Sequence, residues 1–295
     1  MKDAVVFGGS GFLGSYVVEE LARREYNVLI ADTNEPPSVL SGFDFVSCDV
    51  MNVGEVERAV SGRSIVYNFA GFANLDASID RPRETIEKNV IGTINVLEAC
   101  RGADIERFIY ASSAYALSTK GSFYGISKFA SEKIVEEFYN RFSIPFSIVR
   151  YGSLYGERAN PDNAIYRWIT QAYRDGRIVH NGNGEEIREY IHASDAATLS
   201  VDILADAKFE NQHIVLTGVE RMKQNEILQM IKEIFNDRIT VEFTGKMFEG
   251  HYTVTPYSLD PSVARKLVLN EFMDLGQGLV EYAKHIYKTE IDKSE

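Results

Sequence analysis

Short apolar runs alternate with amphipathic stretches along the first half of the chain. Runs rich in Val, Ile and Phe indicate strands, and apolar residues recurring at helical spacing between them indicate helices. The expected strands are residues 4–9, 27–32, 43–49, 64–71, 107–113 and 145–152, and the expected helices are 13–25, 53–62, 84–103 and the stretch around Tyr124. Buried strands separated by helices are typical of βαβ units and a parallel, doubly wound sheet.

The regular alternation breaks after Gly156. A loop and helix are expected over 157–177, turns and a short strand over 181–195, a strand over 212–218, and a helix, a strand and a C-terminal helix beyond. We therefore expect an α/β protein: a Rossmann doubly wound sheet in residues 1–150 and a smaller C-terminal α/β substrate-binding lobe in residues 151–295. The strand near 213–217 can return to the first domain.

A glycine-rich turn follows the first expected strand and opens the first helix. Glycines at this place allow a tight turn and let the backbone approach a pyrophosphate at the positive end of a helix. The turn consists of Gly8, Gly11 and Gly14, with Phe12 and Leu13 inside it. Asp32 ends the second strand, where a carboxylate accepts both ribose hydroxyls and repels a 2′-phosphate. The pattern favours NAD over NADP; the alternative is a glycine turn with an unrelated surface aspartate.

Tyr124 and Lys128 are four residues apart and therefore share one face of a helix. A phenol titrates near pH ~10, so it is a poor base at neutral pH unless a cation stabilises the phenolate. Lys128 supplies that cation. In isolation the pair favours a surface tyrosine over a solvated lysine, but the upstream glycine turn shifts the interpretation to proton transfer beside a nicotinamide.

Charge and composition exclude several classes of partner. The formal net charge is −12 and no block of Lys and Arg occurs, which argues against nucleic acid and membrane surfaces. No apolar run approaches the ~18 residues of a membrane span, and no secretory signal pattern opens the chain. Cys48 and Cys100 are expected to be buried, reduced thiols, so a cytoplasmic location is predicted. The His, Cys and acidic residues show no metal-ligand spacing.

The order of these motifs resembles the extended short-chain dehydrogenase/reductase family. The glycine turn, Asp32, the CDV of 48–50, the NFAG of 68–71, the paired serines at 112–113 and the YxxxK pair carry the resemblance. More narrowly, the chain is similar to the NAD-dependent nucleotide-sugar epimerases and dehydratases. Three later segments support that branch: RYGSLYG at 150–156, GNGEEIREYIHASDAA at 182–197 and SLDPSVARKLV at 258–268.

The resemblance implies a set of residues around NAD. Asp49 and Val50 would meet the adenine, and Asn89 would lie behind the cofactor. The dinucleotide groove would be lined by Phe69, Ala70 and Gly71, together with the glycine turn and the Tyr124–Lys128 pair. For the apolar members, simple core packing is the alternative.

The resemblance also implies the catalytic and substrate residues. Ser113 would hold the reacting oxygen together with Tyr124, although Ser112 could exchange roles with it. Arg188 would pair with the nucleotide diphosphate; the alternative is an ion pair with a neighbouring glutamate. Ser153, Asn163 and Arg265 are further candidates for the substrate subsite, and His192 is expected to be structural.

Two positions after Ser113 depart from the pattern of the 4,6-dehydratases. Those enzymes carry Asp and Glu there, whereas this chain has Ala114 and Tyr115, so dehydration of that type is not expected. The expected reaction is NAD-dependent oxidoreduction at C4 of a nucleotide-linked sugar, most simply a 4-epimerisation. The alternatives are a 4-dehydrogenase, of heptose for example, that releases the keto sugar, and an NAD-sensing protein without chemistry. The resemblance further implies a homodimer.

Overall fold

The structure is a computed structural model that describes residues 2–246, 250–256 and 264–291 of the 295 in the chain. The first part of the family-like segment SLDPSVARKLV, residues 258–263, lies outside the described residues. Within the described residues, no helix combines the length and the apolar character that crossing a membrane requires. Cys48 and Cys100 are both buried and free of a disulfide.

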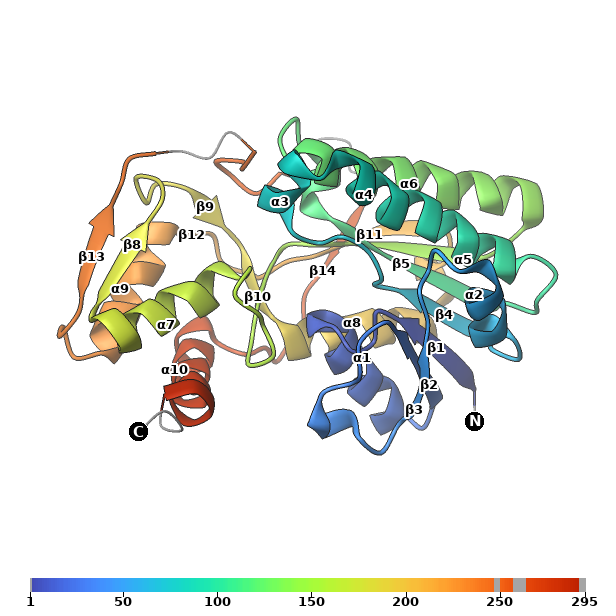
Figure 1. The fold of residues 1–295 in the computed structure, drawn as a ribbon, viewed down its shortest axis with the longest axis horizontal. Coiled ribbons are helices and arrows are strands. Elements are labelled where there is room, and N and C mark those ends of the chain that lie inside the picture. The colour runs from blue at the N-terminus through green and yellow to red at the C-terminus, as the bar shows by residue number, and fades with distance from the viewer. Residues whose placement is uncertain (1, 247–249, 257–263, 292–295) are drawn as a thin grey trace.

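One large sheet organises the molecule (Figure 1). Its eight strands run in the order β14-β11-β6-β5-β4-β1-β2-β3, and every neighbouring pair is parallel. The strands are β1 (Asp3–Phe7), β2 (Asn27–Asp32), β3 (Asp44–Ser47), β4 (Ile65–Asn68), β5 (Arg107–Ser113), β6 (Phe146–Tyr151), β11 (Gln212–Leu216) and β14 (Arg265–Leu267). The predicted α/β class with a doubly wound parallel sheet is confirmed.

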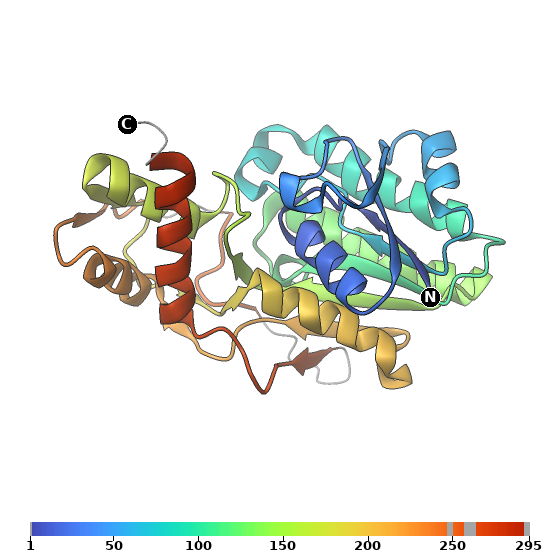
Figure 2. The same ribbon diagram turned by 90° about the horizontal axis from the view of Figure 1, so that it is seen from below.

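Helices cover both faces of this sheet (Figures 1 and 2). On β1, Ala4 and Val6 belong to the core beneath one face, while Val5 and Phe7 belong to the core on the other. Burial on both faces explains why the strands appear in the sequence as continuous apolar runs. One face carries α1 (Phe12–Arg23) and α8 (Ala193–Asp202); the other carries α2 (Val53–Val60), α5 (Gly92–Cys100) and α6 (Ser122–Phe142).

A smaller lobe lies beyond the sheet, on the left of Figure 1. Its apolar core gathers around the buried side chains of Trp168 and Tyr282. The helices are α7 (Ala164–Asp175), α9 (Gln224–Ile234) and α10 (Leu275–Ile286). The strand pairs are β8 (Arg177–His180) with β13 (Thr240–Phe243), β7 (Ser153–Tyr155) with β10 (Tyr190–His192), and β9 (Ile187–Arg188) with β12 (Met222–Lys223).

Two helical features differ from the sequence-based expectation. The helix expected over 84–103 consists of α4 (Pro82–Ile86), a π-helical turn over Glu87–Ile91, and α5. Such π-turns widen a helix locally and are frequent at functional sites. Helix α8 has no counterpart among the expected elements, because its alanines and serines give a weak apolar period, although His192 caps its first turn.

Candidate active site

The glycine turn lies where β1 ends and α1 begins. Gly8 has a φ of 75°, and a Cβ on it would lie 2.7 Å from the backbone nitrogen of Ala70. A Cβ on Gly14 would lie 2.1 Å from the carbonyl oxygen of Gly8. No side chain fits at either position, so the backbone stays open in front of the first turn of α1. This shape fits a pyrophosphate bound at a helix N-terminus.

Asp32, the last residue of β2, lies beside this turn. Its Oδ2 accepts a hydrogen bond from the backbone nitrogen of Ser10 at 3.1 Å, and its Oδ1 accepts one from that of Asn34 at 2.9 Å. These bonds fix the carboxylate at the carboxyl edge of the sheet, where the ribose of a dinucleotide lies in this fold. The residues around the glycine turn therefore fit NAD.

Replacing Asp32 by alanine is expected to weaken NAD binding about 10–100-fold, because hydrogen bonds to a charged group contribute about 1.5–3 kcal/mol. NADP should lose much less affinity, since its 2′-phosphate is repelled by the wild-type carboxylate. Titration of both cofactors against the wild type and Asp32→Ala measures this change. Asp44→Ala, an exposed change in β3, serves as the control. Wild-type protein that prefers NADP would overturn this role of Asp32.

Other residues expected near the cofactor surround the same edge. Phe69 and Ala70 follow β4 and are half-buried, Val50 is buried against Gly92 of α5, and Asp49 is exposed. A Cβ on Gly71 would lie 2.4 Å from Oδ1 of Asn89, so only glycine fits there.

Asn89 joins three segments beneath the site. Its Oδ1 accepts from the backbone nitrogen of Phe72 at 2.6 Å, and its Nδ2 donates to Ser127 Oγ at 2.8 Å. Ser127 Oγ in turn donates to the carbonyl oxygen of Tyr124 at 2.8 Å. The π-helical turn thus holds the loop after β4 against the start of α6.

Ser113 and Tyr124 meet on the wall of a large cavity. Ser113 ends β5 and Tyr124 lies in the first turn of α6, and both line this cavity of about 490 Å³. Burial raises the pKa of Tyr124, while a hydrogen bond from Ser113 lowers it. Ser112 is engaged elsewhere, because its Oγ donates to Glu132 Oε1 at 2.5 Å.

Lys128 lies one turn below Tyr124 and is buried. Its Nζ donates to the carbonyl oxygen of Ala111 at 2.8 Å and lies 5.8 Å from the centroid of the Tyr124 ring. Burial lowers the pKa of Lys128 to about 8, and the nearby Glu132 acts in the opposite direction. At neutral pH the ammonium form is therefore retained, in a position to stabilise a phenolate.

Turnover is expected to fall as the pH rises through about 8, because the pKa of Lys128 is about 8. The lowered pKa means that the cation is present below this pH and lost above it, and with it the stabilisation of the phenolate. A pH profile of kcat/KM measures the effect, with far-UV circular dichroism at each pH as a control for folding. A profile that stays flat up to pH ~10, near the ordinary pKa of lysine, would contradict this role.

Arg188 lines the same cavity and is only 5% exposed. Its Nη1 donates to the carbonyl oxygens of Ile187 at 3.0 Å and Thr253 at 3.4 Å, and its guanidinium lies 4.3 Å from the Tyr252 ring centroid. The neighbouring glutamates contact other basic groups: Glu185 contacts Lys223, Glu186 contacts His180, and Glu189 contacts Arg221 and Lys266. The guanidinium at the cavity wall suits a phosphate or diphosphate.

Of the remaining predicted substrate residues, two line the cavity and one lies away from it. Ser153 and Asn163 line the cavity, and Asn163 also caps α7 by accepting from the backbone nitrogen of Ile165 at 3.0 Å. Arg265 lies exposed in β14, at the edge of the sheet, and is not among the described residues that line the cavity. His192 caps α8, and its Nε2 lies 3.4 Å from Oε2 of Glu157.

Asp76, Tyr115 and His251 are among the polar residues of the cavity that were not expected from the sequence. They lie far apart along the chain, so spacing could not group them. Tyr115 alone carried a signal, as the second residue after Ser113.

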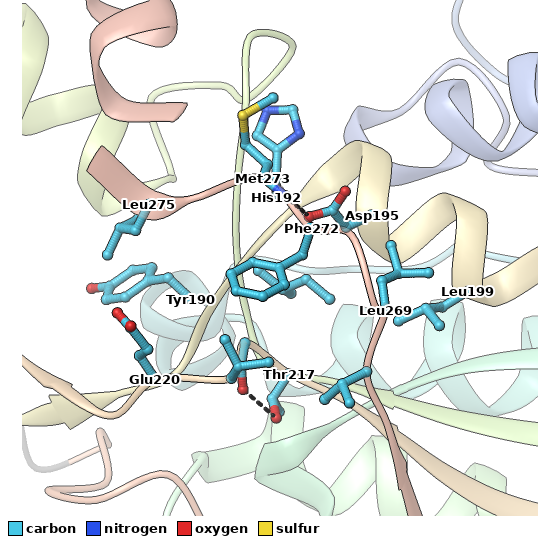
Figure 3. A pocket seen from close by; sticks show the side chains of 14 residues that line it. Tyr190, His192, Asp195, Leu199, Thr217, Glu220, Leu269, Phe272, Met273 and Leu275 are labelled. Carbon is cyan, nitrogen blue, oxygen red and sulfur yellow. Dashed lines mark hydrogen bonds between the residues drawn. The ribbon is translucent and has the colours of Figure 1, made fainter. Parts of the chain in front are cut away.

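A second, much smaller pocket of about 40 Å³ lies between β10, α8 and the segment before α10 (Figure 3). Phe272 and Leu269 point into it, and the backbone nitrogen of Met273 donates to Asp195 Oδ2 at 2.8 Å. A cavity that binds benzene has a volume of about 150 Å³, so a space of this size holds no more than a few water molecules. The side chains that line this pocket pack the segment before α10 against β10 and α8. The space that they leave is too small for a sugar.

Comparison with known proteins identifies a matching family model and several proteins of similar sequence. The model of the NAD-dependent epimerase/dehydratase family matches residues 4–217. The dTDP-D-glucose 4,6-dehydratase of Mus musculus is 26% identical over 79% of this chain and 74% of its own length. The UDP-glucuronate 4-epimerase of Thermodesulfobacterium geofontis is 24% identical over 81% of this chain and 82% of its own.

Among solved structures, the UDP-glucuronic acid 4-epimerase of Bacillus cereus, in complex with UDP-glucuronic acid and NAD, has a similar fold. Its TM-score is 0.84 at 24% identity, over 97% of this chain and 100% of that one. This likeness covers both the sheet and the smaller lobe.

Proposed function

The chain belongs to the NAD-dependent epimerase/dehydratase family, and we propose that it oxidises and re-reduces C4 of a nucleotide-linked sugar as a 4-epimerase. One observation carries the proposal. Ser113 and Tyr124 lie together on the cavity wall, with the buried Lys128 ammonium 5.8 Å from the Tyr124 ring centroid. This arrangement supplies a proton acceptor, a cation that stabilises it and a hydroxyl that positions the sugar.

NAD, when bound, supplies a hydride acceptor and donor. Tyr124 removes the proton of the C4 hydroxyl, because Lys128 stabilises the phenolate that receives it. Ser113 holds the oxygen of the C4 hydroxyl in position by a hydrogen bond. It later holds the same oxygen as the carbonyl of the 4-keto sugar. Tyr124 returns the proton when the 4-keto sugar is reduced. If hydride returns to the opposite face of the sugar, the configuration at C4 is inverted.

The diphosphate of the substrate is proposed to bind at Arg188, the buried guanidinium on the cavity wall. A planar, fork-shaped donor suits two phosphate oxygens better than an ammonium does. Ser153 and Asn163 line the same cavity and are proposed to contact the sugar or its phosphates. UDP-sugars are the first candidates to test, because UDP-sugar epimerases occur among the similar proteins.

Purified protein with NAD and a panel of UDP-, GDP-, CDP- and dTDP-sugars tests the function. Proton NMR of the sugars and the absorbance of reduced nicotinamide are followed together. A C4 stereoisomer formed without net NADH supports the epimerase. If NADH accumulates together with a keto sugar, the protein is a 4-dehydrogenase rather than an epimerase. Bound NAD with no change in any sugar would favour an NAD-sensing role instead.

A homodimer is also proposed, formed through α6. Phe123, Ile126 and Phe129 recur at three-residue spacing on this helix, and these residues are 38%, 60% and 46% exposed. An apolar stripe of this kind on an exposed helix face is typical of helix pairing. Sedimentation at low micromolar concentration should show a dimer for the wild type and a monomer for Ile126→Asp. A monomeric wild type would refute the proposed dimer.

A further inference from the structure

A chain of two hydrogen bonds connects three polar side chains of the large cavity. Oδ1 of Asp76, in α3 (Leu75–Asp80), lies 2.9 Å from Nε2 of His251. Nδ1 of His251 lies 2.9 Å from the hydroxyl of Tyr115. All three residues line the cavity that also contains Ser113 and Tyr124.

With a neutral imidazole at His251, the ionised Asp76 sets the direction of the two hydrogen bonds. The hydrogen bond to His251 lowers the pKa of Asp76, so its carboxylate stays ionised and accepts the proton on Nε2. Nδ1 is then left to accept the hydroxyl proton of Tyr115. Carboxylate, imidazole and hydroxyl stand in the same order as in the triad of serine hydrolases, with a phenol as the last member.

Tyr115 lies beside the proposed catalytic phenol. It is the second residue after Ser113, and its ring centroid is 6.3 Å from that of Tyr124. Burial raises the pKa of Tyr115, so its phenol stays protonated. Tyr115 can therefore act as a base only if a partner accepts its hydroxyl proton. The side chains of Asp76 and His251 are 48% and 34% exposed, which connects the buried phenol to solvent protons.

We propose that Tyr115, linked through His251 to Asp76, is a second acid–base group that removes and returns the proton on a carbon next to the 4-keto group. The proposal rests on the proposed function, because only the C4 ketone makes that proton acidic. The Tyr115 oxygen takes the carbon-bound proton while its own proton passes to Nδ1 of His251. The C–H electron pair forms the enolate, whose oxygen is held by Tyr124 and Ser113, and reversal of these steps restores the ketone.

The residue between Ser113 and Tyr115 limits the fate of the enolate. Ala114 offers no acid to protonate a leaving hydroxyl, so the enolate is reprotonated rather than losing water. The predicted outcome is exchange of the C3 or C5 hydrogen with solvent, with inversion at that carbon if the proton returns to the other face. The site would therefore combine hydride transfer at C4 with proton transfer at an adjacent carbon.

Turnover in D₂O tests the relay. The nucleotide sugar that reacts in the panel is incubated with holoenzyme, and mass spectrometry and NMR locate any deuterium. Hydride transfer is measured in parallel by a single turnover. The wild type should incorporate deuterium at C3 or C5 but not at C4. In Tyr115→Phe, the ratio of incorporation to hydride transfer should fall at least about 100-fold, the lower range for a general base.

Asp76→Asn should lower the ratio less, because it weakens His251 without removing the phenol. The matched control is Tyr139→Phe, which removes a hydroxyl from the exposed part of α6 and should leave the ratio unchanged. NAD affinity reports whether each variant is folded.

Hydride transfer without deuterium at C3 or C5 would overturn the relay and leave the proposed function intact. An unchanged ratio in Tyr115→Phe would exclude Tyr115 as the base. No hydride transfer with any sugar would refute the proposed function, and the relay with it.

Discussion

Tyr124→Phe is expected to reduce turnover by about 10²–10⁴-fold, the usual contribution of a general acid–base group. The change removes one oxygen atom from the cavity wall and leaves the ring, so NAD should still bind. The reason is chemical: the C4 hydroxyl proton loses its acceptor, and Lys128 has no phenolate to stabilise. Single-turnover absorbance of reduced nicotinamide measures the lost step directly.

Cofactor affinity provides the control for this variant. A Kd for NAD within about twofold of the wild type shows that the fold is intact and that the loss is catalytic. Tyr139→Phe, the same chemical change on the exposed part of α6, should keep full turnover. Unchanged turnover in Tyr124→Phe would remove Tyr124 from the proton transfer.

Glu132→Ala is expected to lower the free energy of unfolding by about 3–5 kcal/mol, because it leaves a buried guanidinium without its counterion. Glu132 and Arg150 have side chains only 0% and 2% exposed. The carboxylate accepts from Nε and Nη2 of Arg150 at 2.8 and 2.7 Å. Urea unfolding of the wild type and the variant measures the difference.

Two further variants separate the buried charge from a general loss of packing. Glu132→Leu combined with Arg150→Met removes both charges and should recover much of the stability, as apolar replacement of buried pairs often does. Glu137→Ala breaks the exposed pair of α6 with Arg141 and should change stability by no more than about 1 kcal/mol. If Glu132→Ala lowered the free energy of unfolding by no more than Glu137→Ala does, a role for the buried ion pair in stability would be contradicted.

Much of the sheet was predictable because its strands are buried on both faces. The strands expected over 27–32 and 107–113 have the same bounds in the structure, as β2 and β5. The glycine turn was predictable for a similar reason, since only glycine fits where a Cβ would meet the backbone of Ala70. Local chemistry determines these features, so a single sequence contains them.

Features that depend on distant contacts were not predictable. The cluster of Asp76, Tyr115 and His251 forms only when three separate segments meet at the cavity. The π-turn at Asn89 depends on a side chain that bonds to both Phe72 and Ser127. Arg265 illustrates the converse. It belongs to a family-like segment, yet in the structure it pairs at the sheet edge, away from the cavity.

Hydride transfer at C4 distinguishes the proposed reaction from every alternative that moves only protons, and a sugar nucleotide deuterated at C4 tests it. We expect the deuterium to stay at C4 in a product of inverted configuration, or to be recovered on the reduced nicotinamide if the keto sugar leaves. Deuterium released to water from C4 would show proton chemistry at that carbon and would contradict hydride transfer.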